Sequence, residues 1–238
     1  MPTGPKRNTG CRDGLVQQTN EAMDDCGWPI VEFSNSFEQS KPKQLSAKQV
    51  LYQQGDRVDR VYRIQRGMVK LFSYLSNGRA RIVRLHNENH WLGLEGLVGR
   101  SYEHTAVAVG DLTVACISMN RLQLLERDDP RQYCQILKQG YQYLAQADRW
   151  IADFSTGGIK PRVARLVDFL AKLEHGESSN MVELLTVHEM ADMLGVTPES
   201  VSRILAEFKR NHTLHKLETQ SYQSYQIDCK LLQYEARQ

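Results

Sequence analysis

The sequence predicts an α+β protein in which an antiparallel β jelly roll comes first, a long helix follows, and a winged helix-turn-helix ends the chain. Three observations predict this fold class: short β-type runs from 50 to 117, helical spacing from 133 to 154, and two short amphipathic helices around Gly195. The 238 residues exceed one typical small domain. We therefore expect four segments: an extension at 1–45, a roll at 46–129, a long helix at 130–157 and a winged unit at 158–238.

The first part of the chain changes character at Val50. Residues 1–45 are rich in Gln, Asn, Ser, Lys and Pro, so we expect a loosely attached segment with little chemistry. Asn77-Gly78 between two β-type runs predicts a hairpin, because both residues tolerate positive φ. The expected strands are 50–52, 61–64, 68–75, 81–85, 106–109 and 112–117. Many short strands with turn residues between them indicate an antiparallel roll.

After Asp128-Asp129-Pro130 the spacing becomes helical. Apolar or small residues recur at alternating intervals of four and three: Tyr133, Leu137, Gly140, Leu144, Ala147, Ile151 and Phe154. A helix of about 25 residues spans roughly 37 Å. The roll is one candidate to cover this seam, but the small Gly140 and Ala147 favour close approach of an identical helix. We expect a homodimer, with Gly157-Gly158 ending the helix as a hinge.

The last segment reads as a winged unit. Pro161 is expected to open a helix that ends at Gly176 and whose inner residues are Val163, Leu166, Val167 and Leu170. Met190, Ala191 and Leu194 give the next helix its inner face, and Gly195 supplies a left-handed turn. The runs 215–218 and 222–227, joined by 219–221, predict a β-hairpin wing.

The helix after Gly195 has a well-marked start. Thr197 suits the N-cap, and Pro198 suits the first helical position, where its missing N–H is not needed. An apolar stripe follows at helical spacing: Val201, Ile204, Leu205 and Phe208. Three polar residues share the opposite face: Glu199, Ser202 and Arg203. A solvated face on an ordinary helix pair is the alternative; we expect this face to read double-stranded DNA.

The small net charge of the chain does not by itself indicate a nucleic-acid partner. The chain carries a formal charge of +2, and residues 158–238 hold 10 Lys/Arg against 11 Asp/Glu. DNA affinity must therefore come from a few placed cations, such as Arg203, Lys209, Arg210 and Lys216. No run of 18 apolar residues and no apolar signal peptide occurs, so we expect no membrane association and a cytoplasmic protein. The five cysteines have no regular spacing, which favours free thiols.

Several motifs in order resemble the CRP/FNR family of bacterial transcription regulators. They are Gly55-Asp56, Tyr62-Arg63-Ile64, Gly67-Met68-Val69-Lys70-Leu71, Gly93-Leu94-Glu95-Gly96-Leu97, the long helix and the helix-turn-helix. The resemblance covers the chain from about residue 45 to its end. It implies a cyclic-nucleotide-binding-like roll, a homodimer, and regulation of transcription at DNA, usually as an activator that contacts RNA polymerase.

The resemblance also assigns contacts. Glu199, Ser202 and Arg203 match the Glu-x-x-Ser-Arg reading face of the FNR branch, which implies inverted repeats with TTGAT-like half-sites. An Arg fork suits guanine O6 and N7, and a carboxylate accepts from cytosine N4. Residues expected at the DNA backbone are Thr186, His188, Thr197, Ser200 and Lys209; of these, Thr186 and His188 match phosphate-contacting positions of the family.

The sensor end departs from the family pattern. Cyclic-nucleotide-binding members carry a Gly-Glu pair and an Arg-Ser or Arg-Thr pair, whereas this chain has Gly93-Leu94 and His104-Thr105. Without that carboxylate and guanidinium, the usual binding of cyclic AMP is not expected. Gly93, Leu94, Glu95, His104 and Thr105 remain the candidate residues for an unknown small-molecule effector. A cluster on Cys11, Cys26, Cys116 and Cys134 is disfavoured by their wide spacing.

Two alternatives stay open. One is a cyclic-nucleotide-dependent regulator of the same family. The other, of a different class, is a roll-based metal-dependent enzyme, suggested by His86, Glu88 and His90 within five residues. A turn between strands explains these residues more simply, and no nucleophile–base pair stands out. We therefore expect no enzyme activity, no cofactor and no metal.

Overall fold

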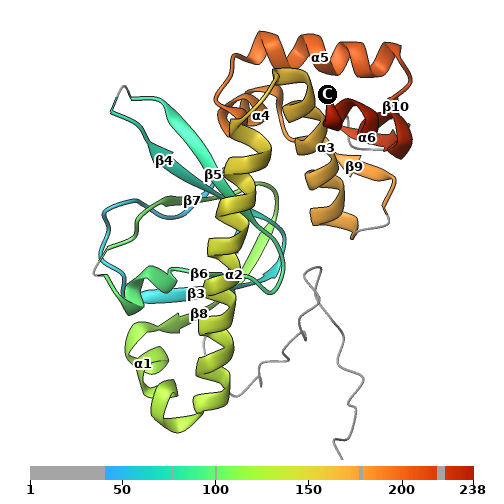
Figure 1. Cartoon of the computed structure of the whole chain (residues 1–238). Coiled ribbons are helices and arrows are strands. Elements are labelled where there is room, and N and C mark those ends of the chain that lie inside the picture. Colours follow the sequence, from blue (N-terminus) through green and yellow to red (C-terminus); the bar gives the residue numbers. More distant parts are fainter. Residues whose placement is uncertain (1–40, 77, 100, 177–178, 219–222) are drawn as a thin grey trace, which may run out of the picture. The chain divides into compact units, whose positions relative to one another are not determined.

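The computed structural model describes residues 41–76, 78–99, 101–176, 179–218 and 223–238. All the described residues belong to the second of the two units into which the chain divides, Phe33–Gln238. The second unit holds all the helices and strands described below (Figure 1). Most of the segment expected as an extension, residues 1–40, lies outside the described residues, and so do Cys11 and Cys26.

The first part of the second unit is an antiparallel roll of two four-stranded sheets. Their strand orders are β1-β8-β3-β6 and β2-β7-β4-β5. The strands are β1 Lys43–Leu45, β2 Val50–Tyr52, β3 Arg60–Arg66, β4 Val69–Tyr74, β5 Ala80–His86, β6 Trp91–Leu92, β7 Thr105–Ala108 and β8 Leu112–Ser118. All six predicted strands are confirmed, with ends shifted by two residues at most. The short strands β1 and β6 were not predicted.

The β4–β5 hairpin has two differently occupied faces. Leu71 pairs with Arg84 and Val69 with His86, and both Val69 and Leu71 belong to the buried core of the roll. Between them, Lys70 pairs with Leu85, which belongs instead to the core of the winged unit. Because side chains alternate along a strand, one face of the hairpin lines the roll and the other meets the winged unit.

Two helices follow the roll. The helix α1, Met119–Asp128, was not predicted; it buries Met119, Leu122 and Leu125 against the roll. The long helix α2, Pro130–Ser155, begins at the predicted residue and ends two residues before the predicted end at 157. The side chain of Asp129 caps it by accepting from the amide of Gln132 at 3.1 Å.

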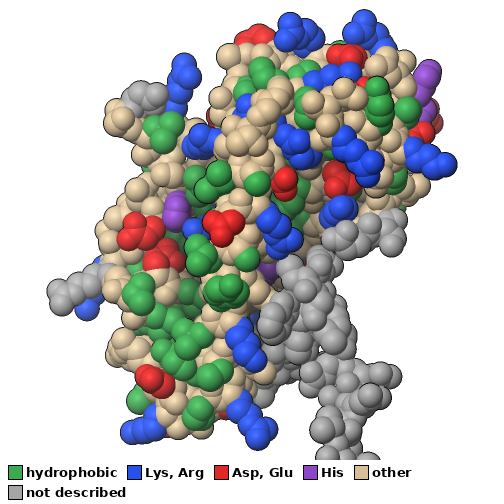
Figure 2. All heavy atoms as spheres, viewed as in Figure 1, with side chains coloured by type: hydrophobic (Ala, Val, Ile, Leu, Met, Phe, Trp, Pro, Cys, Tyr) green, Lys and Arg blue, Asp and Glu red, His purple; other side chains and the backbone are tan. Residues whose placement is uncertain are grey.

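The predicted seam of α2 is covered only at its ends. Tyr133 packs on the roll core and Phe154 on the core of the winged unit. The middle of the seam is open, with Leu137, Leu144 and Ile151 exposed by 47%, 59% and 60%. Figure 2 shows hydrophobic side chains along the course that α2 takes in Figure 1. The roll therefore does not cover the seam, because α2 turns a different set of residues, which includes Ile136 and Tyr143, towards it.

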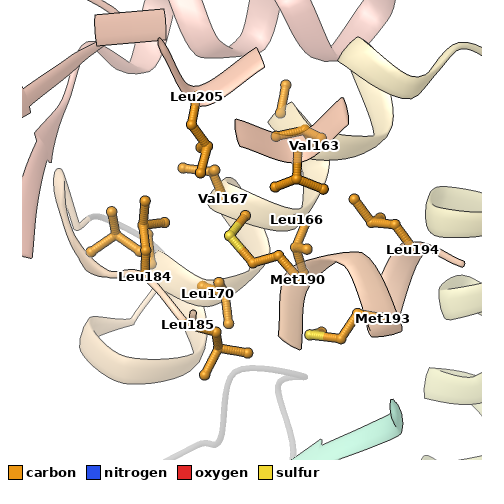
Figure 3. Packing of buried hydrophobic residues seen from close by; sticks show 14 of the residues in the cluster. Val163, Leu166, Val167, Leu170, Leu184, Leu185, Met190, Met193, Leu194 and Leu205 are labelled. Carbon is orange, nitrogen blue, oxygen red and sulfur yellow. The ribbon is translucent and has the colours of Figure 1, made fainter. Parts of the chain in front are cut away.

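The C-terminal part forms a winged unit around one apolar core. Its elements are α3 Ile159–His175, β9 Met181–Glu183, α4 Val187–Leu194, α5 Pro198–Arg210, β10 Leu214–Lys216, β11 Ser224–Ile227 and α6 Cys229–Arg237. Figure 3 shows side chains of α3, α4 and α5 packed together, among them Leu166, Met190 and Leu205. The helix α3 begins at Ile159, slightly before the predicted start at Pro161, and ends at Gly176 as predicted.

The wing differs in detail from the prediction. The strands β10 and β11 pair antiparallel, and β9 adds a third strand beside β11. The predicted connection at 219–221 lies outside the described residues. The helix α6 was not predicted; it packs on α3, and the backbone carbonyl of Ala236 accepts from Arg165 at 2.9 Å. In the described part of the chain, no helix is both long and apolar enough to cross a membrane.

Candidate nucleic-acid interface

The turn between α4 and α5 has the predicted construction. Gly195 adopts the left-handed conformation with φ of 65°, and its amide donates to the carbonyl of Ala191. Thr197 caps α5 by accepting from the amide of Ser200 at 3.4 Å, and Pro198 occupies the first turn. Arg162 of α3 donates to the carbonyls of Phe154 and Leu194, which ties the end of α4 to the end of α2. The turn is therefore held by backbone conformation and by a cation at the C-terminus of α4.

The helix α5 separates a buried face from an exposed one. Its four predicted core residues are all buried: Val201, Ile204, Leu205 and Phe208. Glu199, Ser202 and Arg203 are exposed on the other side. The pKa of Glu199 is lowered by hydrogen bonds from its own backbone amide and from Thr197, so its carboxylate stays charged. The three predicted reading residues are thus brought together on a surface that nothing in the described chain covers.

The residues predicted to contact phosphates lie around this face. Thr186 caps α4 in a capping box with Glu189, and both Thr186 and His188 are exposed. Ser200 is half-buried, and its hydroxyl lies 3.1 Å from that of Thr197. Lys209 is exposed, with its Nζ 4.8 Å from the ring centroid of Tyr225 in the wing. Polar donors therefore flank the reading residues at both ends of α5.

One lysine pairs with an acidic residue of α5 and with one of α6. Lys160 of α3 forms ion pairs with Glu207 of α5 at 2.8 Å and with Glu235 of α6 at 2.7 Å. This bridge neutralises Glu207, one turn after Arg203. Figure 2 shows basic and acidic side chains interspersed over the face it draws, in agreement with the small net charge.

Two further residues near the wing were not singled out from the sequence. His212 and His215 are exposed and stack with their ring centroids 5.5 Å apart, just after the end of α5. His212 has a positive φ of 60°, which turns the chain from α5 into β10. This pair had only a weak signal in the sequence, because a spacing of three residues outside a helix does not predict that two side chains will stack.

The candidate effector residues lie in the roll. Gly93 has φ of 83°, and a Cβ there would lie 3.0 Å from the carbonyl oxygen of Arg60, which explains the glycine. Burial raises the pKa of Glu95 and lowers that of His104, while the buried Thr105 accepts from the amide of Gln54 at 3.0 Å. Leu94 packs against the roll core. Of the side chains at these positions, Leu94 is therefore apolar and Thr105 is already hydrogen-bonded within the roll.

Arg84 is a cation of the roll interior that the sequence reasoning missed. It lies opposite Leu71 on the face that lines the roll. Burial raises the pKa of Tyr52, Glu95 and Tyr143, and the charge of Arg84 partly opposes that rise. Burial lowers the pKa of His86 and His104, and the same charge adds to the lowering. None of the described carboxylates forms an ion pair with it. The alternation of β5 was the available signal, since it places Arg84 on the same face as His86.

The metal alternative concerns His86 and His90. Their rings lie 5.4 Å apart, and that of His86 is 4.8 Å from Tyr143 of α2. His86 is fully buried, and burial lowers its pKa well below the ordinary value. Within the described ranges, no group of three or more His, Cys, Asp or Glu residues is placed to hold a metal ion. In the described part of the chain, Cys116, Cys134 and Cys229 form no disulfide.

The roll, the long helix and the winged helix-turn-helix define the class of two-domain regulators that join a sensor-type β-roll to a DNA-binding unit. Residues 42–140 match the cyclic nucleotide-binding domain, and residues 164–227 match the Crp-like helix-turn-helix domain. Together with the relatives described next, these matches show that the chain belongs to the CRP/FNR family of transcriptional regulators.

Several relatives align over both domains. The transcriptional regulator LdrP of Thermus thermophilus is 24% identical over 82% of this chain and 96% of its own length. The transcriptional activator protein Anr of Pseudomonas protegens is 27% identical over 71% of each chain. The structure of FixK2 from Bradyrhizobium japonicum has a TM-score of 0.72 at 20% identity, covering 82% of this chain and 96% of that one. The fold is therefore that of the family, and LdrP and Anr are named as a transcriptional regulator and a transcriptional activator.

Proposed function

We propose that the protein binds, as a homodimer, a DNA inverted repeat with TTGAT-like half-sites and regulates transcription there. The observation that carries this proposal is the exposed face of α5, on which Glu199, Ser202 and Arg203 stand above a fully buried stripe. An Arg fork reads guanine, a carboxylate accepts from cytosine, and a hydroxyl adapts to its neighbour. Two such helices related by a two-fold axis read half-sites about 34 Å apart.

The open seam of α2 supports the homodimer. Leu137, Leu144 and Ile151 are exposed at helical spacing. Apart from its chain neighbours and the nearby backbone of its own helix, no described atom lies within 4 Å of the position that a Cβ of Gly140 would take. An identical helix would cover these residues and bring two winged units together. The proposal places the protein in the cytoplasm with the DNA, where a bound dimer contacts RNA polymerase or blocks it.

The roll is proposed to gate this binding through an unknown small-molecule signal. A signal that binds one arrangement of the dimer better than another shifts the population towards it. A cyclic nucleotide is disfavoured, because Leu94 and His104 stand where the ribose acceptor and the phosphate clamp are required. Titration of cyclic AMP into the protein tests this alternative, and stoichiometric binding would support it.

Fluorescence anisotropy with a labelled duplex carrying the inverted repeat tests the DNA proposal. A second duplex has the half-site G·C pair changed, and Arg203→Ala is compared with Lys209→Ala. Arg203→Ala is expected to cost about 1–3 kcal/mol on the intact repeat and to reduce discrimination between the duplexes. Lys209→Ala is expected to weaken both duplexes equally. Equal binding of both duplexes by the unaltered protein, with and without cell extract as a source of effector, would contradict the half-site assignment.

A further inference from the structure

The helix α4 is held by the roll at both of its ends. Near its start, Glu189 forms an ion pair with Lys70 of β4, and the two side chains are only 18% and 7% exposed. At its end, a Cβ on Gly195 would lie 3.3 Å from Cζ of Arg81, which precedes Ile82 on β5. The β4–β5 hairpin therefore contacts the helix-turn-helix at two separated points.

Apolar packing supports these two contacts. Met68, Ile82 and Leu85 of the roll belong to the same buried cluster as Met190 and Met193 of α4. The helix α4 packs directly on β5. This packing covers the inner side of α4 and leaves Thr186 and His188 exposed. The docked arrangement is therefore compatible with phosphate contacts by both residues.

The ion pair continues into the first turn of α4. One carboxylate oxygen of Glu189 accepts from Lys70, and the other accepts from the amide of Thr186 at 3.0 Å and from its hydroxyl at 2.7 Å. Burial would raise the pKa of Glu189, but the hydrogen bonds from Lys70 and Thr186 outweigh it and lower the pKa. A continuous chain of polar contacts thus runs from β4 through Lys70 and Glu189 to Thr186.

We propose that Lys70, a residue of the roll, is a positioning residue for DNA binding: through Glu189 it fixes the end of α4 that carries Thr186 and His188. The proposal rests on the proposed DNA binding. Without Lys70, Glu189 is a buried carboxylate with no cation, and it leaves the roll to regain water. Molecules with α4 in place bind with full affinity, whereas molecules with α4 displaced bind without the phosphate contacts that Lys70 positions, so the apparent Kd rises as the docked fraction falls.

The first test measures DNA affinity of Lys70→Met beside Lys43→Met, a matched change at an exposed lysine of the roll. Lys70→Met is expected to raise the Kd for the inverted repeat about tenfold, which corresponds to docking of about one molecule in ten. The ratio of affinities for intact and changed duplexes should stay the same, because phosphate contacts carry no sequence information. The active fraction from stoichiometric titration should also stay the same. A Kd equal to that of Lys43→Met would overturn the proposal.

Two variants separate positioning from a general loss of folded protein. In a His188→Ala background, Lys70→Met should weaken binding by less than threefold, a rough bound, because the contact that Lys70 positions is already lost. The double variant Lys70→Met/Glu189→Gln should recover most of the affinity, since no unpaired carboxylate remains and the Gln oxygen still accepts from Thr186. Additive losses with His188→Ala, or a double variant as weak as Lys70→Met, would contradict the mechanism.

Hydrogen exchange tests the same contact without DNA. The amides of 190–194 in α4 should exchange faster in Lys70→Met than in Lys43→Met, because α4 leaves the roll more often. Unchanged exchange would overturn the positioning role, whether or not the duplex is bound. Failure of the unaltered protein to prefer the inverted repeat would instead contradict the proposed function while leaving the exchange result valid.

Discussion

Replacing Leu144 by alanine tests the dimer through one exposed side chain of α2. Leu144 lies in the middle of the seam and is 59% exposed. Complete burial of a leucine contributes about 2.5 kcal/mol, so covering this exposed share contributes about 1.5 kcal/mol for each copy. Two copies meet in a symmetric dimer, which gives about 3 kcal/mol in total. Leu144→Ala should therefore raise the dimer dissociation constant about 100-fold.

Sedimentation equilibrium over a concentration series measures that constant. Leu124→Ala is the matched control, because Leu124 is 48% exposed but lies on α1, away from the seam. Both variants should unfold at the same denaturant concentration when dilute enough to be monomeric, since neither leucine packs in the core of the chain. The reasoning would be refuted by equal dissociation constants for Leu144→Ala and Leu124→Ala, or by a monomeric unaltered protein at high concentration.

Three further changes test the fold around the site by urea unfolding. Thr197→Ala removes the cap of α5 and should lower the free energy of unfolding by about 1 kcal/mol. Ser202→Ala is the control, because Ser202 lies on the same helix without a cap role and its loss should change the stability little. Equal losses for the two variants would contradict the capping role. Gly67→Ala should cost about 1–3 kcal/mol, because φ is 93° and a Cβ would lie 2.3 Å from the carbonyl oxygen of Asp111. The control Gly110→Ala has open space, and a Gly67→Ala protein as stable as Gly110→Ala would argue against this close approach. The pKa of His86 is lowered by burial and, to a smaller extent, by His90, Arg84 and His104, so on acidification the unfolded chain takes up a proton at this histidine before the folded chain does. Stability should fall as pH drops below the ordinary value of 6.5, by at most about 1.4 kcal/mol per pH unit, and His86→Leu should flatten that slope; an unchanged slope would show that other groups cause it.

The reading helix could be predicted from local sequence because its signals are local. Thr197, Pro198 and the stripe ending at Phe208 lie within thirteen or so residues, and each acts through its own helix. The strands of the roll were also predictable, since turn residues such as Gly78 separate them. The structure confirms the reading helix and the roll strands, and neither prediction required knowledge of contacts between residues distant in the sequence.

The elements that were missed depend on distant partners or on a weaker local signal. The strand β9 has three residues and exists because it pairs with β11, more than forty residues later. The helix α6 buries only Leu232 of its own chain segment and is tied to α3 by Arg165. The helix α1 did have a local signal, namely the cap at Ser118 and the spacing of Met119, Leu122 and Leu125. It was missed because the start of helical structure was placed after the following Asp-Asp-Pro.

The contact between Lys70 and Glu189 was beyond prediction for the same reason. The two residues are 119 positions apart, and nothing in either neighbourhood marks them as partners. The effector residues show a related limit. The family pattern locates Gly93 and His104, but Arg84, whose charge acts on both Glu95 and His104, stands at a position that the pattern does not include.

The side chains of the β4–β5 hairpin alternate between the interior of the roll and the core of the winged unit. Both faces of the hairpin therefore fix its register. Neighbouring residues of β5 face opposite sides of the hairpin: Arg84 and His86 face the roll, while Leu85 faces the winged unit. A slip of one residue in this strand would place a guanidinium and an imidazole in the apolar core under α4 and a leucine in the roll. Insertions or deletions between Gly78 and His86 should therefore damage both halves of the molecule at once, whereas single substitutions at these positions can alter one side and spare the other.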